Sequence, residues 1–168
     1  MSQRTRIIIA IVVLLVLAGA VLAVDALQRA SPGASATPGV PTVPAGNIPV
    51  YVDAQLAGSF GPGDLEPLAK VSFAEPVEGQ AQEGWLLRDA LLLVVDRAAL
   101  RPESRIVVSS SSRAKQAEVT WAEVDNPDNF VMFDLSNRGT LKLASVLPKL
   151  DTREEWVQDV DRVEIFTR

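Results

Sequence analysis

An uninterrupted apolar segment near the start of the chain constrains its folding more than any other feature. Residues 7–24, which begin with Ile7 and end with Val24, consist only of Ile, Val, Leu, Ala and Gly. As a helix with a rise of about 1.5 Å per residue, the segment would span about 27 Å, close to the roughly 30 Å hydrocarbon thickness of a bilayer. A small soluble domain could not cover every side of such a helix. The segment therefore predicts one transmembrane helix, with the lipid bilayer as its partner.

The flanking charges predict how the helix is oriented. Residues 1–6 form a short basic end, with Arg4 and Arg6 just before the apolar segment and Arg29 beyond it. The positive-inside rule places this end in the cytoplasm. A cleavable signal peptide is the alternative, but the segment is longer than the roughly 7–15 residues of a typical signal core, which favours a retained signal anchor. We expect a single-pass protein of the plasma membrane whose remaining residues are extracytoplasmic.

A linker is predicted at residues 25–47. Its composition changes after Arg29 to Ser, Pro, Gly, Ala and Thr, and residues 30–47 carry no charge. Its prolines favour an extended conformation while its glycines add flexibility, so the linker should hold the rest of the chain away from the bilayer. Residues 48–168 are then long enough for one domain with one core.

The charge of that domain argues against nucleic acid as a partner. Residues 48–168 contain 13 basic and 20 acidic residues, a net charge of −7. Nucleic acid binding requires a basic face, and a field of this sign repels polyphosphate. An acidic, solvated surface that favours solubility is the simpler interpretation.

Cysteine and histidine are both absent from the chain. Disulfides, thiolate or imidazole metal sites, cysteine nucleophiles and Ser-His-Asp triads are therefore excluded. A lipid anchor on cysteine is excluded for the same reason. A domain outside the cytoplasm must then be stabilised by its core alone.

Short strands dominate the predicted secondary structure of the domain. Alternating apolar residues bounded by turn residues predict strands at 48–52, 56–60, 70–75, 105–109, 116–121, 130–134, 140–143 and 160–166. Turns that join neighbouring strands are expected at 53–55, near 109–115 and at 136–139, and a polar loop is expected at 76–83.

Two or three short helices are expected beside these strands. The apolar face formed by Leu87, Leu91 and Val94 predicts a helix over residues 84–94. Asp64 is expected to cap a helical turn that reaches Leu68, and residues 151–154 have the spacing of a capping box for a short helix that reaches residue 156. Strands and helices do not alternate, so we predict an α+β domain with a mostly antiparallel sheet.

Three groups of polar or aromatic residues are candidates for binding. Oxygen ligands at Asp125, Asp128, Asn129 and Asp134 would suit calcium, although their spacing is not that of an EF-hand and a turn explains them better. Asp159, Asp161 and Glu164 could be paired carboxylates of a glycosidase, but residues 159 and 161 would share one strand face, and solvated charges on a strand explain them better. The tryptophans at positions 85, 121 and 156 would either stack on carbohydrate or belong to the core.

A run of serines forms another candidate. Ser109, Ser110, Ser111 and Ser112 precede Arg113, and Lys115 lies two residues further on. Hydroxyls beside basic groups suit a small anion, and residues 112–115 have the spacing of Ser-x-x-Lys. The segment is nevertheless expected to be a hairpin turn between two strands.

Two blocks resemble the sulfite oxidase-like molybdopterin-binding domain family. The sequence GWLLRDALL at residues 84–92 is similar to a Gly-x-x-Leu-x-Asp-Leu-Leu helix of the family, and WVQDVDRVEI at 156–165 is similar to its closing signature. Between the blocks, WAEV at 121–124 matches a segment that supplies a short helix, and GTLKL at 139–143 resembles a strand. The resemblance covers residues 50–166 in outline and implies the scaffold of that family.

The resemblance also implies a cofactor that this chain is poorly equipped to hold. In the family a cysteine thiolate binds molybdenum, and histidine and arginine contact the pterin phosphate. The position where that cysteine would be sought holds Ser109, Ser110, Ser111 and Ser112, followed by Arg113. By position these five residues are the candidates for cofactor binding. No cofactor is expected, molybdopterin with a serine ligand is the alternative, and no catalytic residue is transferred.

These observations favour a binding or assembly role over catalysis. We expect a membrane-anchored extracytoplasmic module on a sulfite oxidase-like scaffold, without catalytic molybdenum and with an envelope protein as partner. A divergent molybdopterin-dependent oxidoreductase is the alternative that makes the chain an enzyme. A cell-envelope polysaccharide-binding domain is a further alternative, and it requires exposed tryptophans.

Overall fold

The computed structural model describes residues 42–75 and 79–168. The predicted transmembrane segment 7–24 and residues 25–41 of the predicted linker lie outside the described residues. Within the described part of the chain, no helix is long and apolar enough to cross a membrane. The described residues belong to one compact unit that begins at Pro41 and ends at Arg168.

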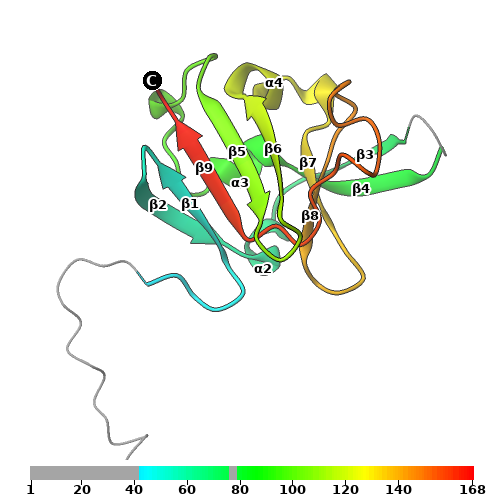
Figure 1. Cartoon of the computed structure of the whole chain (residues 1–168), viewed down its shortest axis with the longest axis horizontal. Helices are drawn as coiled ribbons and strands as arrows, with labels where there is room; N and C mark the ends of the chain where they lie inside the picture. Colours follow the sequence, from blue (N-terminus) through cyan, green and yellow to red (C-terminus); the bar gives the residue numbers. More distant parts are fainter. Residues whose placement is uncertain (1–41, 76–78) are drawn as a thin grey trace, which may run out of the picture. The chain divides into compact units, whose positions relative to one another are not determined.

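This unit is an α+β domain dominated by antiparallel strands (Figure 1). The helices are short: α2 (Pro62–Leu65), α3 (Leu87–Leu91) and α4 (Trp121–Asp125), with 3-10 turns at Arg97–Ala99 and Pro127–Asn129. The strands are β1 (Ile48–Val52), β2 (Gln55–Phe60), β3 (Lys70–Ala74), β4 (Ala81–Leu86), β5 (Arg105–Ser110), β6 (Lys115–Thr120), β7 (Met132–Leu135), β8 (Leu141–Ala144) and β9 (Arg162–Phe166).

The first sheet has five strands in the order β2-β1-β9-β5-β6. The last strand, β9, lies in its centre, parallel to β1 and antiparallel to β5. Its buried residues Val163 and Ile165 face the core, as the predicted alternation requires. The sheet therefore has β2 and β6 as its outer strands.

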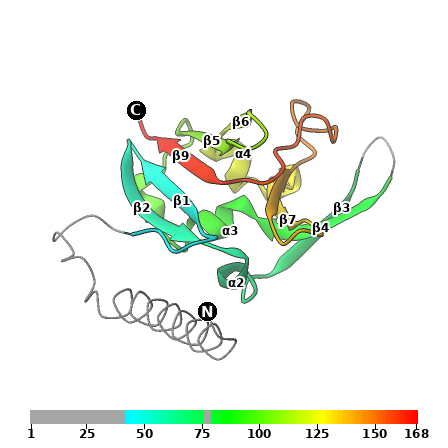
Figure 2. The same ribbon diagram turned by 60° about the horizontal axis from the view of Figure 1, so that its bottom comes forward.

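The second sheet has four strands in the order β3-β4-β7-β8, all antiparallel. The hairpin of β3 and β4 extends away from the other strands (Figure 2). Phe73 of this hairpin packs edge-on against Trp156, with ring centroids 6.3 Å apart, in a small second apolar cluster. The main core lies between the two sheets and includes Phe60 and Phe133, whose rings are 5.8 Å apart.

The predicted hairpins, whose turns are formed by residues adjacent in the sequence, are confirmed. Strands β1 and β2 are joined by Asp53 and Ala54, both with positive φ, as a two-residue hairpin turn requires. The Asp53 carboxylate also accepts a hydrogen bond from the backbone N–H of Thr167 at 3.1 Å. The hairpins β5–β6 and β7–β8 are formed as expected, with serine-rich and Gly139-containing turns.

The predicted helix over residues 84–94 is wrong in its first part. Residues 84–86 belong to β4, where Gly84 pairs with Asp134 and Trp85 with Phe133, and only Leu87–Leu91 are helical. The loop predicted at 76–83 is shortened for the same reason, because β4 begins at Ala81. Strand pairing with β7 outweighs a helical apolar pattern that the isolated segment would satisfy.

The predicted helix over residues 151–156 does not form. The segment makes one turn, in which the Glu155 N–H donates to the Thr152 carbonyl at 3.1 Å. Trp156 Nε1–H donates to the Leu150 carbonyl at 2.8 Å, and Leu143 N–H donates to the Val157 carbonyl. These contacts bring the segment back to the end of β8 before a helix can continue.

Two helix starts also differ from expectation. Asp64 lies inside the first turn of α2 and accepts from the Gly61 N–H at 2.8 Å, so it does not occupy the cap position itself. Trp121 begins α4 and does not end a strand, because Thr120 and Glu123 form a reciprocal capping box. The short helix implied at residues 121–124 is therefore present.

Gly84 is required by the close approach of β4 and β7. A Cβ atom at this position would meet the carbonyl oxygen of Phe133 at 2.0 Å. Because the obstructing atom belongs to the backbone, Gly84→Ala must displace the strands, and we expect a loss of about 3 kcal/mol in the free energy of unfolding. Urea denaturation followed by tryptophan fluorescence measures the change.

Gly63→Ala is the matched control for that substitution. A Cβ at Gly63, in α2, would meet nothing within 4 Å. Alanine should therefore raise the free energy of unfolding by about 0.5–1 kcal/mol. Equal stability of the two variants would contradict the proposed close approach.

Candidate functional site

The serine run lies at the turn of the β5–β6 hairpin. Ser109 and Ser110 end β5, and Ser111 to Ala114 form the turn, which Ala114 closes with a positive φ. Ser110 is buried, and its Oγ lies 3.2 Å from the Oγ of Ser112. The segment is the hairpin turn that its sequence predicts.

Asp161, the residue before β9, holds this turn in place. Its carboxylate accepts hydrogen bonds from both the N–H, at 2.8 Å, and the hydroxyl of Ser111. The Asp161 N–H in return donates to the Ser109 carbonyl at 3.0 Å. The hydroxyls of Ser110, Ser111 and Ser112 are thus used in internal hydrogen bonds.

Asp159 joins a second turn to the same hairpin. Its side chain accepts from Thr140 Oγ1 and Arg113 Nε, each at 2.7 Å, and from Arg138 Nη2 at 3.1 Å. The hydrogen bond from Thr140, followed by that from Arg113, lowers the pKa of the Asp159 carboxyl below its usual value. Asp159 and Asp161 precede β9, so the expectation that they lie on one face of a strand is wrong.

The polar residues near position 125 have partners within the protein. Asp125 accepts two hydrogen bonds from the Arg97 guanidinium, at 2.9 and 2.8 Å, and this interaction lowers the pKa of its carboxyl. Asn129 donates to the Glu123 carbonyl, and Asp134 pairs with Lys142. No group of three or more acidic side chains suited to a metal occurs among residues 42–75 and 79–168.

The three tryptophans are core residues. Trp85, Trp121 and Trp156 are each at most 4% exposed. The stacking surface that polysaccharide binding would need is therefore not formed by these rings.

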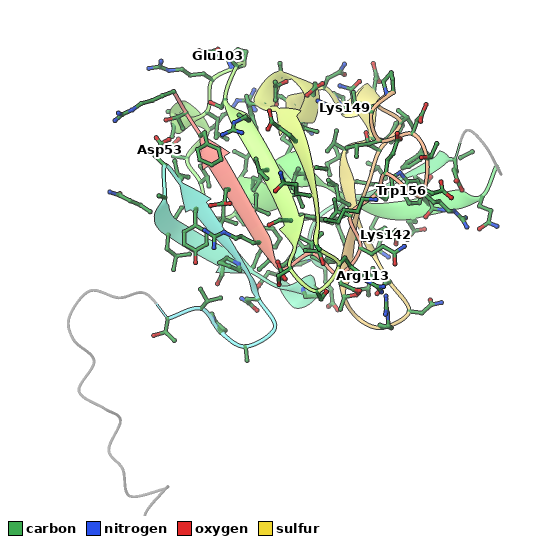
Figure 3. All side chains as sticks on the ribbon, in the orientation of Figure 1. Asp53, Glu103, Arg113, Lys142, Lys149 and Trp156 are labelled. Atoms are coloured by element: carbon green, nitrogen blue, oxygen red, sulfur yellow. The ribbon has the colours of Figure 1, made fainter. Side chains whose placement is uncertain are left out.

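A hollow lies where the β5–β6 turn meets the segment before β9. It encloses about 270 Å³ and is lined by Arg113, Lys115, Arg153, Glu154, Trp156 and Gln158. Figure 3 shows Arg113 at the tip of the hairpin, with Lys142 and Trp156 to one side. Three cations and one carboxylate line this basic hollow, which makes it locally positive on an acidic domain.

The cations of the basic hollow differ in their partners. Arg153 Nε donates to the buried carboxylate of Glu75 at 2.8 Å, and Arg113 pairs with Asp159. Lys115 Nζ donates to the main-chain carbonyl of Glu154. Within the described part of the chain no carboxylate pairs with Lys115, so its charge is available to a ligand.

A second depression continues from the basic hollow along the outer side of β6. It measures about 370 Å³ and is lined by residues of β6 and of the segment opposite, namely Lys115, Gln116, Ala117, Glu118, Lys149, Leu150, Glu154 and Glu155. Lys115 and Glu154 border both depressions, so the two depressions form one continuous surface, which we call the β6 groove. Figure 3 places Arg113 near one end of it and Lys149 near the other.

The serine turn does not fit a molybdenum site. Ser110 and Ser111, two of the hydroxyls that would replace the family thiolate, are engaged by Ser112 and Asp161. The side chains of Ser111, Ser112 and Arg113 are exposed on the tip of the hairpin. An open hollow of about 300 Å³ beside the turn is lined by residues 109–111 together with Asp161 and Arg162, and it adds no thiol or imidazole ligand. Of the residues predicted by position, Arg113 alone borders the basic hollow.

The main components of the β6 groove carry little signal in the sequence. Lys115 is distinguished only by its spacing from Ser112, while Arg153 and Gln158 belong to no binding motif. The alternation of Gln116 and Glu118 with apolar residues predicts a strand with one solvent-exposed face. It does not indicate that the strand forms the border of a sheet, because strand order depends on distant segments.

Comparisons with known proteins do not identify a family. No family model matches the chain, and no curated protein is significantly similar to it. The resemblance at residues 84–92 and 156–165 therefore stays a prediction. The function must be inferred from the geometry of the domain itself.

The Asp159 contacts predict an acid-dependent loss of stability. Because the pKa of Asp159 is lowered in the folded state, its stabilising contribution is present above the unfolded value, about 3.9, and is lost as pH falls through the lower folded value. Asp159→Asn, which keeps a side chain tolerant of positive φ, should be less stable at pH 7 and should lose less free energy of unfolding between pH 7 and about pH 3.

Urea denaturation across that pH range tests the prediction. Asp128→Asn is the control, since no ion pair of Asp128 occurs within the described residues. A wild-type pH dependence in the Asp159→Asn variant would show that the three contacts of Asp159 do not depend on its charge.

Proposed function

We propose that the chain is a membrane-anchored extracytoplasmic binding module on a sulfite oxidase-like scaffold, without catalytic molybdenum. The β6 groove carries this proposal, because it combines an open strand border with a locally positive end. Its partner would be another protein of the cell envelope. The function is then attachment or assembly at the membrane surface.

The arrangement of polar groups supports binding in preference to catalysis. The candidate nucleophiles Ser110 and Ser111 hydrogen-bond within the protein, and the carboxylates of Asp159 and Asp161 hold turns in place. A nucleophile needs an adjacent base, and a general acid or base must reach a substrate proton. These groups are committed to structure, whereas the β6 groove is accessible.

The proposed scaffold is supported by where the two family-like blocks lie. Residues 84–92 form the end of β4 and helix α3, and residues 156–165 lead into β9. Both contribute buried side chains to the main core, including Leu87, Leu91, Val163 and Ile165. Similarity carried largely by buried positions supports a common framework and does not extend to shared chemistry.

The proposed topology predicts which positions a membrane-impermeant reagent can reach. The chain contains no cysteine, so one introduced thiol reports unambiguously. In intact cells that express the full chain, Glu103→Cys, at an exposed position of the domain, should react with a charged maleimide. Ser2→Cys, on the predicted cytoplasmic side, should react only after permeabilisation, and the reverse pattern would contradict the proposal.

The absence of a molybdenum cofactor is tested on the purified full chain. We expect substoichiometric molybdenum by elemental analysis and no pterin fluorescence after oxidation. A Ser111→Ala variant should show the same metal content as the wild type, because Ser111 binds Asp161. One molybdenum per chain, lost in that variant, would favour the oxidoreductase alternative.

A further inference from the structure

The hydrogen-bond pattern of the β5–β6 hairpin identifies which backbone groups of β6 face outward. Trp121 N–H donates to the Ser104 carbonyl, so residues 119, 117 and 115 continue the hydrogen-bonded pairs with β5. The backbone groups of Gln116 and Glu118 then point away from β5. The Ser109 carbonyl, opposite Gln116, agrees with this assignment because it accepts from Asp161 on the β9 side.

These outward groups have no partner within the described residues. No hydrogen bond joins the main-chain N–H or carbonyl of Gln116 or Glu118 to residues 149–155, which form the opposite wall of the β6 groove. Thr120 differs, because its N–H is capped by Glu123 at 2.7 Å. Two residues therefore offer two donors and two acceptors to an incoming chain.

Strand β6 carries charged side chains at Lys115 and Glu118, but it lacks the backbone irregularities that commonly protect an outer strand. It contains neither proline nor glycine, and its six residues pair with β5 without a bulge. By contrast, the outer strand β2 pairs with β1 through a register shift beside Val50 and Tyr51. Strand β6 is thus a regular template for strand addition.

The charges beside this border indicate the direction and chemistry of an added strand. Strand β6 begins at Lys115, so a strand antiparallel to it would end beside Lys115 and the basic hollow. Arg113, Lys115 and Arg153 would surround a carboxylate at that end. The charge of Lys115 has no carboxylate partner in the described part of the chain.

We propose that the β6 groove binds an extended peptide segment of an envelope protein by antiparallel strand addition to Gln116 and Glu118, with a carboxylate at the peptide's C-terminal end held near Lys115. The inference rests on the proposed binding function and specifies its partner. The opposite wall at residues 149–155 favours a single extended chain over the border of another folded sheet. The chain's own linker is a poor occupant, because Pro32, Pro38, Pro41 and Pro44 lack the donors that a ladder needs.

Peptide selection on the full chain in detergent tests the proposal. The probe is a library of random heptapeptides displayed with free C-termini, and the enriched peptides are synthesised as carboxylate and as amide. We expect enrichment of β-branched residues and a carboxylate form that binds about tenfold more tightly than the amide. Lys115→Gln should reduce that difference.

Substitution of Glu118 separates backbone from side-chain recognition. Glu118→Pro removes an outward N–H that β5 does not use, and should weaken peptide binding about tenfold. Glu118→Ala keeps the N–H and removes only the side chain, which borders the groove and pairs with Arg105, so it should weaken binding less than Glu118→Pro does. Equal losses in the two variants would show that the side chain, and not the main-chain N–H, is recognised. Thermal unfolding of both variants establishes that each is folded.

Amide exchange in the wild type decides the proposal independently of any variant. Bound peptide should slow the exchange of the Gln116 and Glu118 amides, while the Thr120 amide, already capped by Glu123, should change little. Failure to enrich any peptide, or binding without this protection, would overturn strand addition. Either result would contradict strand addition alone. The proposed function is tested separately, by the membrane topology and by the molybdenum content.

Discussion

The central position of β9 is the constraint on which the rest of the domain depends. Strand β9 is inserted between β1 and β5, which lie far from it in the sequence, so the five-stranded sheet is complete only when residues 162–166 are in place. Asp159 and Asp161, just before β9, attach two turns to this strand through charged hydrogen bonds. Asp159, which engages the β5–β6 turn of one sheet and the β7–β8 turn of the other, therefore stabilises the join between the sheets, while Asp161 fixes the β5–β6 turn to β9.

Local structure could be predicted from the sequence where both halves of a contact lie close together. The turns at Asp53 and at Ser111 were identified because their residue types favour tight turns and their flanking strands are adjacent. The helix over residues 84–94 was mispredicted because Gly84 pairs with Asp134, fifty residues away. The open border of β6 could not be foreseen for a related reason, since it depends on the whole strand order and not on residues 115–120 alone.

At the candidate site, too, the turn could be predicted from adjacent residues, but the contacts made by distant residues could not. The serine run and Arg113 were recognisable from residue type, and the turn they form is present. Their chemistry was not recognisable, because Asp161 and Asp159 engage Ser111 and Arg113 from positions 50 and 46 residues away. The positive charge that stays available belongs to Lys115, whose neighbour Glu154 contributes a carbonyl and not a carboxylate.

Strand addition to so short a strand border gives a low affinity. The proposed membrane anchor would make that low affinity sufficient for binding. Four main-chain hydrogen bonds contribute about 1 kcal/mol each at most after exchange with water, which alone supports only modest affinity. Confinement of both proteins to one membrane surface raises the effective concentration of the partner without any new contact. The predicted linker, uncharged over residues 30–47 and containing prolines and glycines, would let the domain reorient at the membrane surface. Weak strand addition would then be sufficient for binding at the membrane and insufficient for stable aggregation elsewhere. An outer strand with unpaired main-chain groups, such as β6, can be tolerated for this reason.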